Sequence, residues 1–86
     1  MKYDQHFLRD FEIAKKIVSF LDLKENEKVL EIGPGKGILT QYLKGNITIV
    51  EIDKNLCKEL KEKFPDIKVI NANILKYNAN FDKIIC

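Results

Sequence analysis

The sequence contains one glycine-rich stretch, Glu31-Ile32-Gly33-Pro34-Gly35-Lys36-Gly37, directly after the apolar residues Val29 and Leu30. The residues that follow it, 38–44, have the apolar spacing of a helix. An apolar strand that ends in glycines and continues at once into a helix brings backbone N–H groups and a helix N-terminus to one point. A nucleotide-like ligand can bind there, so the stretch predicts a cofactor-binding loop.

The spacing of the glycines separates this loop from two better-known phosphate loops. A P-loop needs Lys and Ser or Thr directly after its last glycine, whereas Ile38 follows Gly37. The dinucleotide fingerprint has two residues before its third glycine, whereas one residue separates Gly35 from Gly37. The remaining alternative is a strand-to-helix turn without a ligand. Three glycines in five residues carry a backbone entropy cost that a plain turn does not require.

The rest of the chain predicts alternating helices and strands. Strands are expected at residues 28–32, 47–50, 67–70 and 81–86, and helices at about 10–21, 38–44 and 54–64. Asp10, after a loop over residues 1–9, and Asp53 are the expected N-caps of the first and third helices, and Gly45 the C-cap of the second. This order predicts parallel strands with right-handed crossovers, the first half of an α/β, Rossmann-like sheet whose fourth strand is an uncovered edge.

Each of the three expected helices has an apolar side, which in the second consists of Ile38, Leu39, Tyr42 and Leu43. In the first, the residues expected to be buried are Ile13, Ile17, Phe20 and Leu21, with Ala14 and Val18 beside them. In the third they are Leu56, Leu60 and Phe64, with Cys57 alongside, and Pro65 ends the helix. The many charged residues between them form a solvated face.

Composition limits the chain to one small globular domain. It has 86 residues, of which 45% are apolar and 33% charged, and a net charge of +2 that is too small to argue for nucleic-acid binding alone. Two cysteines outside a C-x-x-C pair and one histidine indicate neither a metal site nor a disulfide framework. No stretch is apolar enough for a membrane span or a signal peptide. We therefore expect a reduced, cytoplasmic protein.

The loops after the first three strands should meet, because ligands bind at the carboxyl ends of parallel strands. Gly33, Gly35 and Gly37 would let the backbone approach a cofactor. The Glu51 carboxylate can accept hydrogen bonds from ribose hydroxyls, and the Asn73 amide can pair with an adenine edge. The alternative for Glu51 is a solvent-facing acid beside Asp53.

The single histidine, His6, also invites a catalytic interpretation. A lone histidine more often packs or hydrogen-bonds locally, and no serine, cysteine or paired acid lies near it in the sequence. Tyr3, Tyr42 and Tyr77 are most simply core or rim aromatics, with base stacking by one of them as the alternative.

Four segments together resemble one known family. The acid-x-Gly-x-Gly-x-Gly pattern at 31–37 is similar to motif one of S-adenosylmethionine-dependent methyltransferases. In order, the segments are Gln5-His6-Phe7-Leu8, Glu31-Ile32-Gly33-Pro34-Gly35-Lys36-Gly37-Ile38-Leu39-Thr40, Val50-Glu51-Ile52-Asp53 and Ala72-Asn73-Ile74-Leu75. The sequence resembles the N-terminal part of the ribosomal RNA adenine dimethyltransferases (KsgA/Erm type), over essentially its whole length.

The resemblance implies a set of contacts with S-adenosyl-L-methionine. His6 and Leu8, in the arm that begins at Gln5, would contact the methionine part, and the loop at Gly33 would lie against the cofactor. Glu51 would bind the ribose and Asn73 the adenine. The remaining cofactor-binding candidates are Glu31, Gly35 and Gly37. The family usually has Asp at the position of Asn73, so the uncharged amide is expected to weaken cofactor binding.

The resemblance also implies that the catalytic residues lie outside this chain. The family's Asn-(Ile/Leu)-Pro-(Tyr/Phe) motif, which grips the target adenine and stacks on it, follows a strand like residues 81–86. Residues 1–86 are therefore expected to form a single partial domain, the cofactor-binding half of a methyltransferase domain. Most of the surface for ribosomal RNA would lie in the missing part.

The leading hypothesis is thus the S-adenosylmethionine-binding segment of an enzyme that methylates the exocyclic amine of adenine in ribosomal RNA. The alternatives are a non-catalytic S-adenosylmethionine- or nucleotide-binding remnant, or half of a split enzyme completed by a second chain. A methyltransferase with another substrate is also open, since this half of the fold is widely shared. Neither a metal ion nor a membrane is an expected partner.

Overall fold

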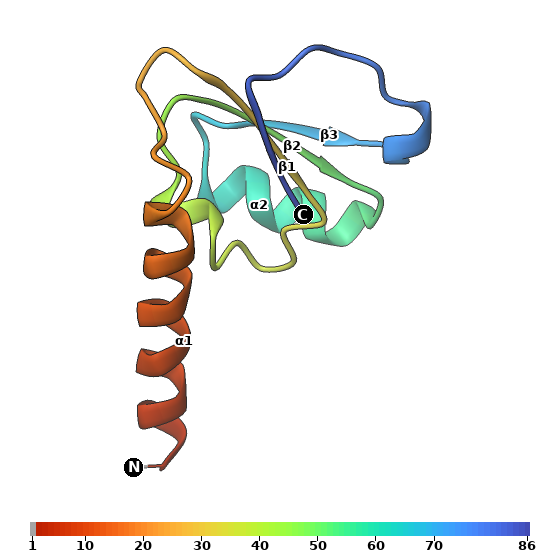
Figure 1. Cartoon of the computed structure of the whole chain (residues 1–86). Helices are drawn as coiled ribbons and strands as arrows, with labels where there is room; N and C mark the ends of the chain where they lie inside the picture. Colours follow the sequence, from red (N-terminus) through yellow and green to blue (C-terminus); the bar gives the residue numbers. More distant parts are fainter. Residues whose placement is uncertain (1) are drawn as a thin grey trace.

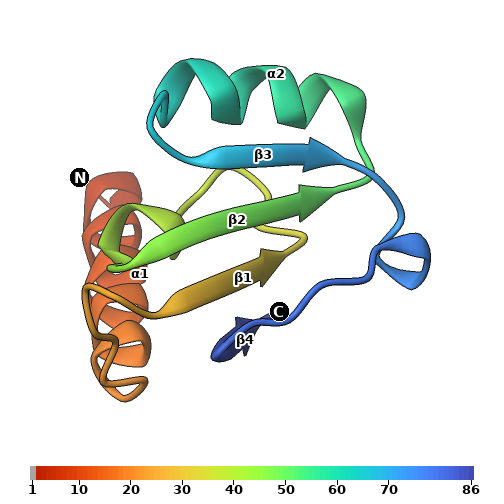
Figure 2. The same ribbon diagram turned by 90° about the horizontal axis from the view of Figure 1, so that it is seen from above.

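The computed structural model describes the backbone of residues 2–86 and the side chains of residues 10–86. Its centre is a parallel sheet of four strands, β1 (Lys28–Ile32), β2 (Asn46–Glu51), β3 (Lys68–Asn71) and β4 (Lys83–Ile85). The strands lie in the order β3-β2-β1-β4 (Figures 1 and 2). The predicted half of a Rossmann-like sheet, with the fourth strand at an edge, is confirmed.

The centre of the sheet is apolar and buried. Val29 in β1 and Ile49 in β2 are both 0% exposed, and Val50 beside Ile49 is 1% exposed. Strands covered on both faces are expected to be continuous apolar runs, and β1 and β2 have such runs. The two strands are paired over five residues, from Lys28↔Asn46 to Ile32↔Val50, so their carboxyl ends lie level with each other.

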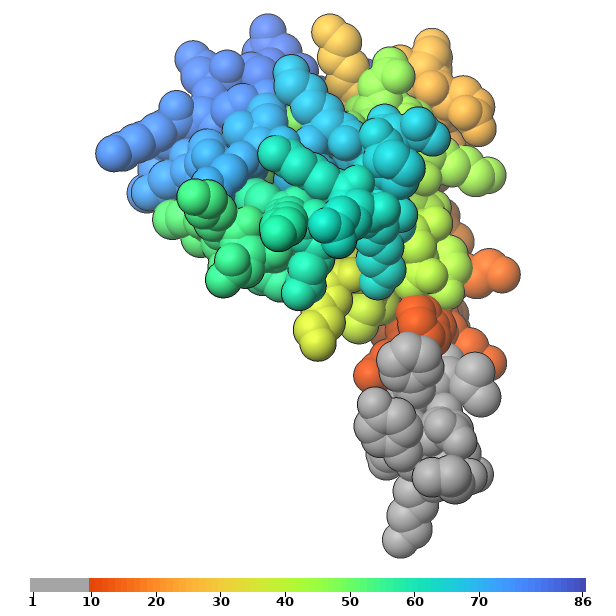
Figure 3. All heavy atoms as spheres, turned by 180° about the vertical axis from the view of Figure 1, so that it is seen from behind, coloured from red at the N-terminus to blue at the C-terminus, as the bar shows by residue number. Residues whose placement is uncertain are grey.

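The helix α2 (Lys54–Lys63) covers one face of the sheet, over β2 and β3. The Asp53 carboxylate accepts hydrogen bonds from the backbone N–H groups of Asn55 and Leu56, at 2.8 and 3.0 Å, which confirms the predicted N-cap. Cys57 and Leu60 are buried, as predicted. In the space-filling view of Figure 3, α2 and β3 form much of the visible surface.

The helix α1 runs over Lys2–Ser19, so the predicted loop at residues 1–9 is wrong for residues 2–9, and Asp10 lies inside the helix. No glycine or proline occurs between Lys2 and Ser19, so nothing local prevents the helix from beginning early. Figure 2 shows α1 beside the ends of the sheet where β1 and β2 begin.

The buried side of α1 also differs from the prediction. Ala14 and Val18 are buried, at 3% and 8% exposure, whereas Ile13, Ile17 and Phe20 are exposed at 49%, 45% and 77%. The helix packs on the short turn η1 (Thr40–Tyr42), and Ala14 and Val18 are the buried apolar residues of α1 among those whose side chains are described. The wider apolar row stays on the surface of the described part of the chain.

The predicted helix at residues 38–44 is replaced by η1, a single turn of 3-10 helix. Its backbone bonds join Tyr42 N–H to Leu39 O and Leu43 N–H to Thr40 O, at 3.0 and 3.1 Å. After η1 the backbone at Gly45 runs close to the turn that precedes β1. A Cβ on Gly45 would lie only 2.7 Å from the carbonyl oxygen of Glu27. Gly45 is therefore needed for this close approach, and the prediction that it caps an α-helix is wrong. Too few residues lie between the glycine loop and Gly45 for a longer helix.

A second 3-10 turn, η2 (Ile74–Lys76), follows β3. The segment after it leads back across the sheet to β4, which pairs with the opposite side of β1 from β2. The carboxyl ends of all four strands point the same way, so the loops after β1, β2 and β3 lie at one edge of the sheet.

Candidate functional site

A cavity of about 150 Å³ lies at the carboxyl ends of β1, β2 and β3. It brings together Gly33, Glu51 and Asn73, one predicted cofactor-binding residue from each of three loops. The other lining residues are Ile32, Val50, Ile52, Ala72 and Ile74. Complete pockets for small molecules usually measure roughly 300–1,000 Å³. The cavity therefore has the size of part of such a site, with mostly apolar walls and a few polar groups.

Gly33 presents bare backbone to this cavity. Its φ is +61°, a left-handed conformation that side chains rarely adopt, and its N–H donates to Val50 O at 3.1 Å. No heavy atom lies within 4 Å of the position that a Cβ would take. A ligand can thus approach the main chain at Gly33 without meeting a side chain.

The other two glycines of the loop do not line the cavity. Gly35 also has a φ of +61° and open space at its Cβ position. Gly37 has a φ of +89°, and a Cβ there would lie 2.6 Å from Cε2 of the Phe64 ring. Gly37 therefore allows the loop to pack against the end of α2, which fixes the loop relative to the sheet.

Glu31 is buried under the loop, at 2% exposure, and is not among the residues that line the cavity. Its Oε1 accepts a hydrogen bond from the Thr40 hydroxyl. Burial raises the pKa of the Glu31 carboxyl, and the Thr40 hydrogen bond acts in the opposite direction. This hydrogen bond joins β1 to η1, the two elements on either side of the glycine loop, so Glu31 helps to fix the conformation of the loop. Thr40 has no predicted role in the sequence analysis, although it lies in the quoted motif.

Glu51 ends β2 and is 6% exposed, which excludes the alternative of a solvent-facing acid. Its Oε2 accepts a hydrogen bond from the backbone N–H of Asp53 at 2.9 Å. Among the residues that the structure describes, none donates to its Oε1. One carboxylate oxygen at the cavity therefore remains able to accept a hydrogen bond from a ligand.

The main chain of Glu51 is held by the neighbouring elements. Its carbonyl oxygen accepts hydrogen bonds from Ala72 N–H and Asn71 Nδ2, both at 3.1 Å, and from Cys57 Sγ at 3.3 Å. Asn71 Nδ2 also donates to Ile52 O at 3.0 Å. Burial is the main cause that raises the pKa of the Cys57 thiol, which keeps it a neutral donor. No pattern in the sequence indicates this role for Asn71, and Cys57 is predicted only to lie on the inner face of a helix.

Asn73 caps η2 through its side-chain oxygen, which accepts from Leu75 N–H at 3.0 Å. This hydrogen bond identifies the capping atom as the oxygen of the amide, because only the oxygen can accept from an N–H group. The Nδ2 group has no hydrogen-bond partner in the described part of the chain. Asn73 can thus donate freely to a ligand, while its acceptor is shared with the turn.

Three further predicted contacts, Gln5, His6 and Leu8, lie outside the residues whose side chains are described. Over the described residues, no group of three or more His, Cys, Asp or Glu side chains could hold a metal ion. Within the same part of the chain, no helix has the length and apolar character needed to cross a membrane.

Comparison with known proteins yields one consistent group. A family profile described as "Ribosomal RNA adenine dimethylase" matches residues 1–84. "Ribosomal RNA small subunit methyltransferase A" of Malacoplasma penetrans is 42% identical over 80 residues, covering 90% of this chain and 29% of that protein. The protein of the same name from Flavobacterium johnsoniae is 46% identical over 81 residues, covering 88% and 31%. The chain thus spans about a third of the length of these relatives.

Solved structures give the same fold. The 23S rRNA methyltransferase ErmE superimposes with a TM-score of 0.73 and 36% identity, covering 80% of this chain and 31% of ErmE. Coclaurine N-methyltransferase, solved with SAH, superimposes with a TM-score of 0.74 and 18% identity, covering 87% of this chain and 26% of that enzyme. The second likeness concerns the fold alone. The expected methyltransferase fold, in its N-terminal part, is confirmed.

Proposed function

Because this chain belongs to the ribosomal RNA adenine dimethylase family, we propose that it is the cofactor-binding segment of an rRNA adenine methyltransferase. The complete enzyme would transfer methyl groups from S-adenosylmethionine to the exocyclic amine of an adenine in ribosomal RNA. The relatives bear the name of rRNA methyltransferases, and one of the structural neighbours is bound to SAH.

The observation that carries this proposal is the meeting of Gly33, Glu51 and Asn73 in one cavity at the carboxyl ends of three parallel strands. Carboxylates at the end of the second strand bind ribose hydroxyls in dinucleotide folds, and the open Oε1 of Glu51 suits the same contact. Asn73 Nδ2 can donate to an adenine ring nitrogen. The exposed backbone at Gly33 leaves room for the part of the cofactor beyond the ribose.

The other predicted site residues have supporting roles in this proposal. Glu31, Gly35 and Gly37 shape the loop, Glu31 through Thr40 and Gly37 through Phe64. Gln5, His6 and Leu8 would contact the methionine part, as the resemblance implies. When bound, S-adenosylmethionine supplies an electrophilic methyl group, and the residues of this chain hold and orient it. Catalysis in such a site is mainly positioning.

The target is proposed to be an unpaired adenine in folded ribosomal RNA, since base edges are inaccessible in duplex RNA. Residues 1–86 would be one part of a larger protein, because the chain spans about 30% of its relatives. The remainder, or a second chain, would supply the catalytic motif and most of the RNA surface. A ribosomal substrate is also consistent with a cytoplasmic location.

The proposal is tested with the complete gene product and unmethylated ribosomal RNA. We expect transfer of labelled methyl groups from S-adenosylmethionine to adenine, detected as methylated adenosine after digestion. Glu51→Gln should raise the dissociation constant of the cofactor by about tenfold, because a charged acceptor is replaced by a neutral one. Glu62→Gln, on the solvated side of α2, is the matched control and should leave it unchanged.

A second candidate function is a protein that binds S-adenosylmethionine without turnover. It is favoured by Asn73, where the family usually has a carboxylate and where the oxygen already caps η2. Calorimetry that shows cofactor binding, together with no methylated adenosine in any ribosomal RNA, would establish this function and refute the first. Absence of cofactor binding would exclude both.

A further inference from the structure

The strand order reverses between β1 and β4. The chain proceeds from β1 to β2 and β3 on one side and then returns to place β4 on the other side of β1. Ligands in open α/β sheets bind at such a reversal of strand order, outside the carboxyl ends of the strands. Glu31 of β1 pairs with Ile85 of β4, so the end of β4 lies beside the start of the glycine loop. At the crevice that such a reversal leaves in open α/β sheets, β4 would form one wall.

The sheet itself holds β4 only weakly. The strand has three residues, paired with Val29, Leu30 and Glu31, and it lies at the edge of the sheet. Ile85 is buried at 8% exposure, whereas Ile84 is 59% exposed. An edge strand this short has few ladder hydrogen bonds and little apolar burial to fix its place. Contacts at its beginning consequently carry much of its attachment.

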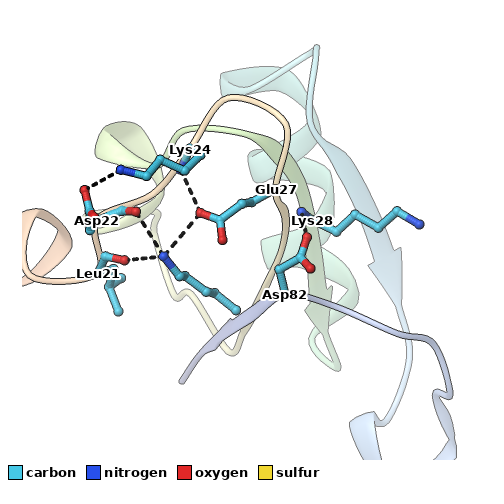
Figure 4. Close-up of polar contacts among 7 residues, drawn as sticks. Leu21, Asp22, Lys24, Glu27, Lys28 and Asp82 are labelled. Atoms are coloured by element: carbon cyan, nitrogen blue, oxygen red, sulfur yellow. Dashed lines mark hydrogen bonds and ion pairs between the residues drawn. The ribbon is translucent and has the colours of Figure 1, made fainter.

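The side chain of Lys83 provides such a contact, with Leu21, Asp22 and Glu27, which are labelled in Figure 4. Its Nζ donates to Leu21 O at 2.6 Å and to Asp22 O at 2.9 Å, and lies 3.2 Å from Glu27 Oε1. The two carbonyls lie just beyond the end of α1, in the connection that leads to β1. An ammonium group has three donors, and three oxygens surround it here. Lys83 thus joins β4 to the connection between α1 and β1.

The neighbouring residue Asp82 fixes the same point to β1. Its Oδ2 accepts from Lys28 N–H at 2.8 Å, and its own N–H donates to Lys28 O at 2.8 Å. These hydrogen bonds fix the register in which β4 starts along β1. The Lys83 side chain instead contacts the connection between α1 and β1, so it restrains the position of β4 relative to that connection.

We propose that Lys83 is a positioning residue that holds β4 against β1 and thereby sets the crevice where the target adenine meets the cofactor. The second half of this statement rests on the proposed function, whereas the attachment of β4 does not. Lys83 touches neither cofactor nor base. Its effect would pass through β4 to whatever follows that strand at the edge of the crevice.

The first experiment measures hydrogen exchange in the complete gene product. In Lys83→Met, the amides of residues 82–85 should exchange at least about tenfold faster, as expected for the loss of charge-assisted hydrogen bonds. Amides of α2 should be unchanged. Lys24→Met is the matched control: it removes a lysine charge from the connection that Lys83 contacts, where Lys24 pairs with Asp22 at side-chain exposures of 60% and 80%. Equal exchange in the two variants would overturn the proposal.

The second experiment separates positioning from general stability. With ribosomal RNA as substrate, Lys83→Met should lower kcat by about tenfold or more while KM for S-adenosylmethionine changes little, because misplacing a reactant costs rate. Lys83→Arg, which keeps the charge and the donors, should recover most of the loss. A parallel rise in KM for the cofactor, or no recovery with arginine, would contradict a positioning role.

A milder variant covers the case in which Lys83→Met does not fold. Glu27→Gln removes the charge facing Nζ and keeps both carbonyl contacts, and it should speed exchange in β4 by about threefold relative to Lys24→Met. No difference would overturn the proposal. If the wild-type protein methylates no adenine, the proposed function fails, whereas the exchange data still decide whether Lys83 holds β4.

Discussion

Replacement of Gly37 by alanine is expected to destabilise the fold more than the same change at Gly35. Both residues have positive φ, +89° and +61°, which costs a residue with a side chain roughly 1–2 kcal/mol. Only at Gly37 would the new methyl group meet another atom, 2.6 Å from the Phe64 ring. Forcing an extra methyl group into packed surroundings adds roughly 1–3 kcal/mol. We therefore expect a loss of about 2–5 kcal/mol for Gly37→Ala and about 1–2 kcal/mol for Gly35→Ala.

Urea unfolding of the complete gene product measures this difference, from the shift in midpoint at an unchanged slope. A double-mutant cycle with Phe64→Leu identifies the cause, because leucine lacks the ring atoms that the methyl group would meet. In that background the penalty of Gly37→Ala should fall to that of Gly35→Ala. Equal losses for the two glycine variants, or a penalty that persists beside Leu at position 64, would refute the assignment of Gly37 to packing against α2.

Two further changes probe the loop and the adenine contact. Thr40→Val removes the hydroxyl that donates to buried Glu31, so it should cost about 1–3 kcal/mol of unfolding free energy at pH 7. Burial raises the pKa of Glu31 in the folded state, so the folded protein favours the protonated carboxyl. The loss of unfolding free energy caused by Thr40→Val should therefore shrink as the pH falls through that raised pKa. A loss that is independent of pH in urea titrations would contradict this. Asn73→Asp keeps an oxygen for the η2 cap and exchanges the Nδ2 donor for a charged acceptor of the adenine amine, so calorimetry should show about tenfold tighter S-adenosylmethionine binding. Weaker binding would instead show that donation by Nδ2 to a ring nitrogen is the contact that decides affinity.

The strands and α2 were predictable because local sequence determines them. Val29 and Leu30 form an apolar strand before a glycine, and the Ile47–Val50 run is β-branched, so neither segment has a competing local structure. Asp53 satisfies the first N–H groups of α2 from the adjacent residue. The ends of these strands then fix where Gly33, Glu51 and Asn73 meet, because side chains that follow parallel strands share one edge.

The wrong predictions concern segments whose structure is determined by contacts with residues distant in the sequence. On α1, the rows through Ile13 and through Ala14 are both apolar and adjacent, and only the position of η1 selects the narrower one for burial. At residues 38–44 the apolar spacing suits a helix, but Thr40 is drawn to Glu31, and Gly45 must pass the carbonyl of Glu27. Asn71 was missed for the same reason: its role depends on the carbonyls of Glu51 and Ile52, at and just after the end of β2, which no spacing in the sequence indicates.

The hydrogen bonds to the carbonyl oxygen of Glu51 mean that the proposed ribose contact is preorganised. A carboxylate on a loose loop loses conformational freedom when a ligand arrives, and that loss weakens binding. Here Ala72, Asn71 and Cys57 already fix the main chain, and Asp53 holds one carboxylate oxygen. The entropy of ordering Glu51 is lost during folding, so less of that cost opposes the binding of a ribose hydroxyl.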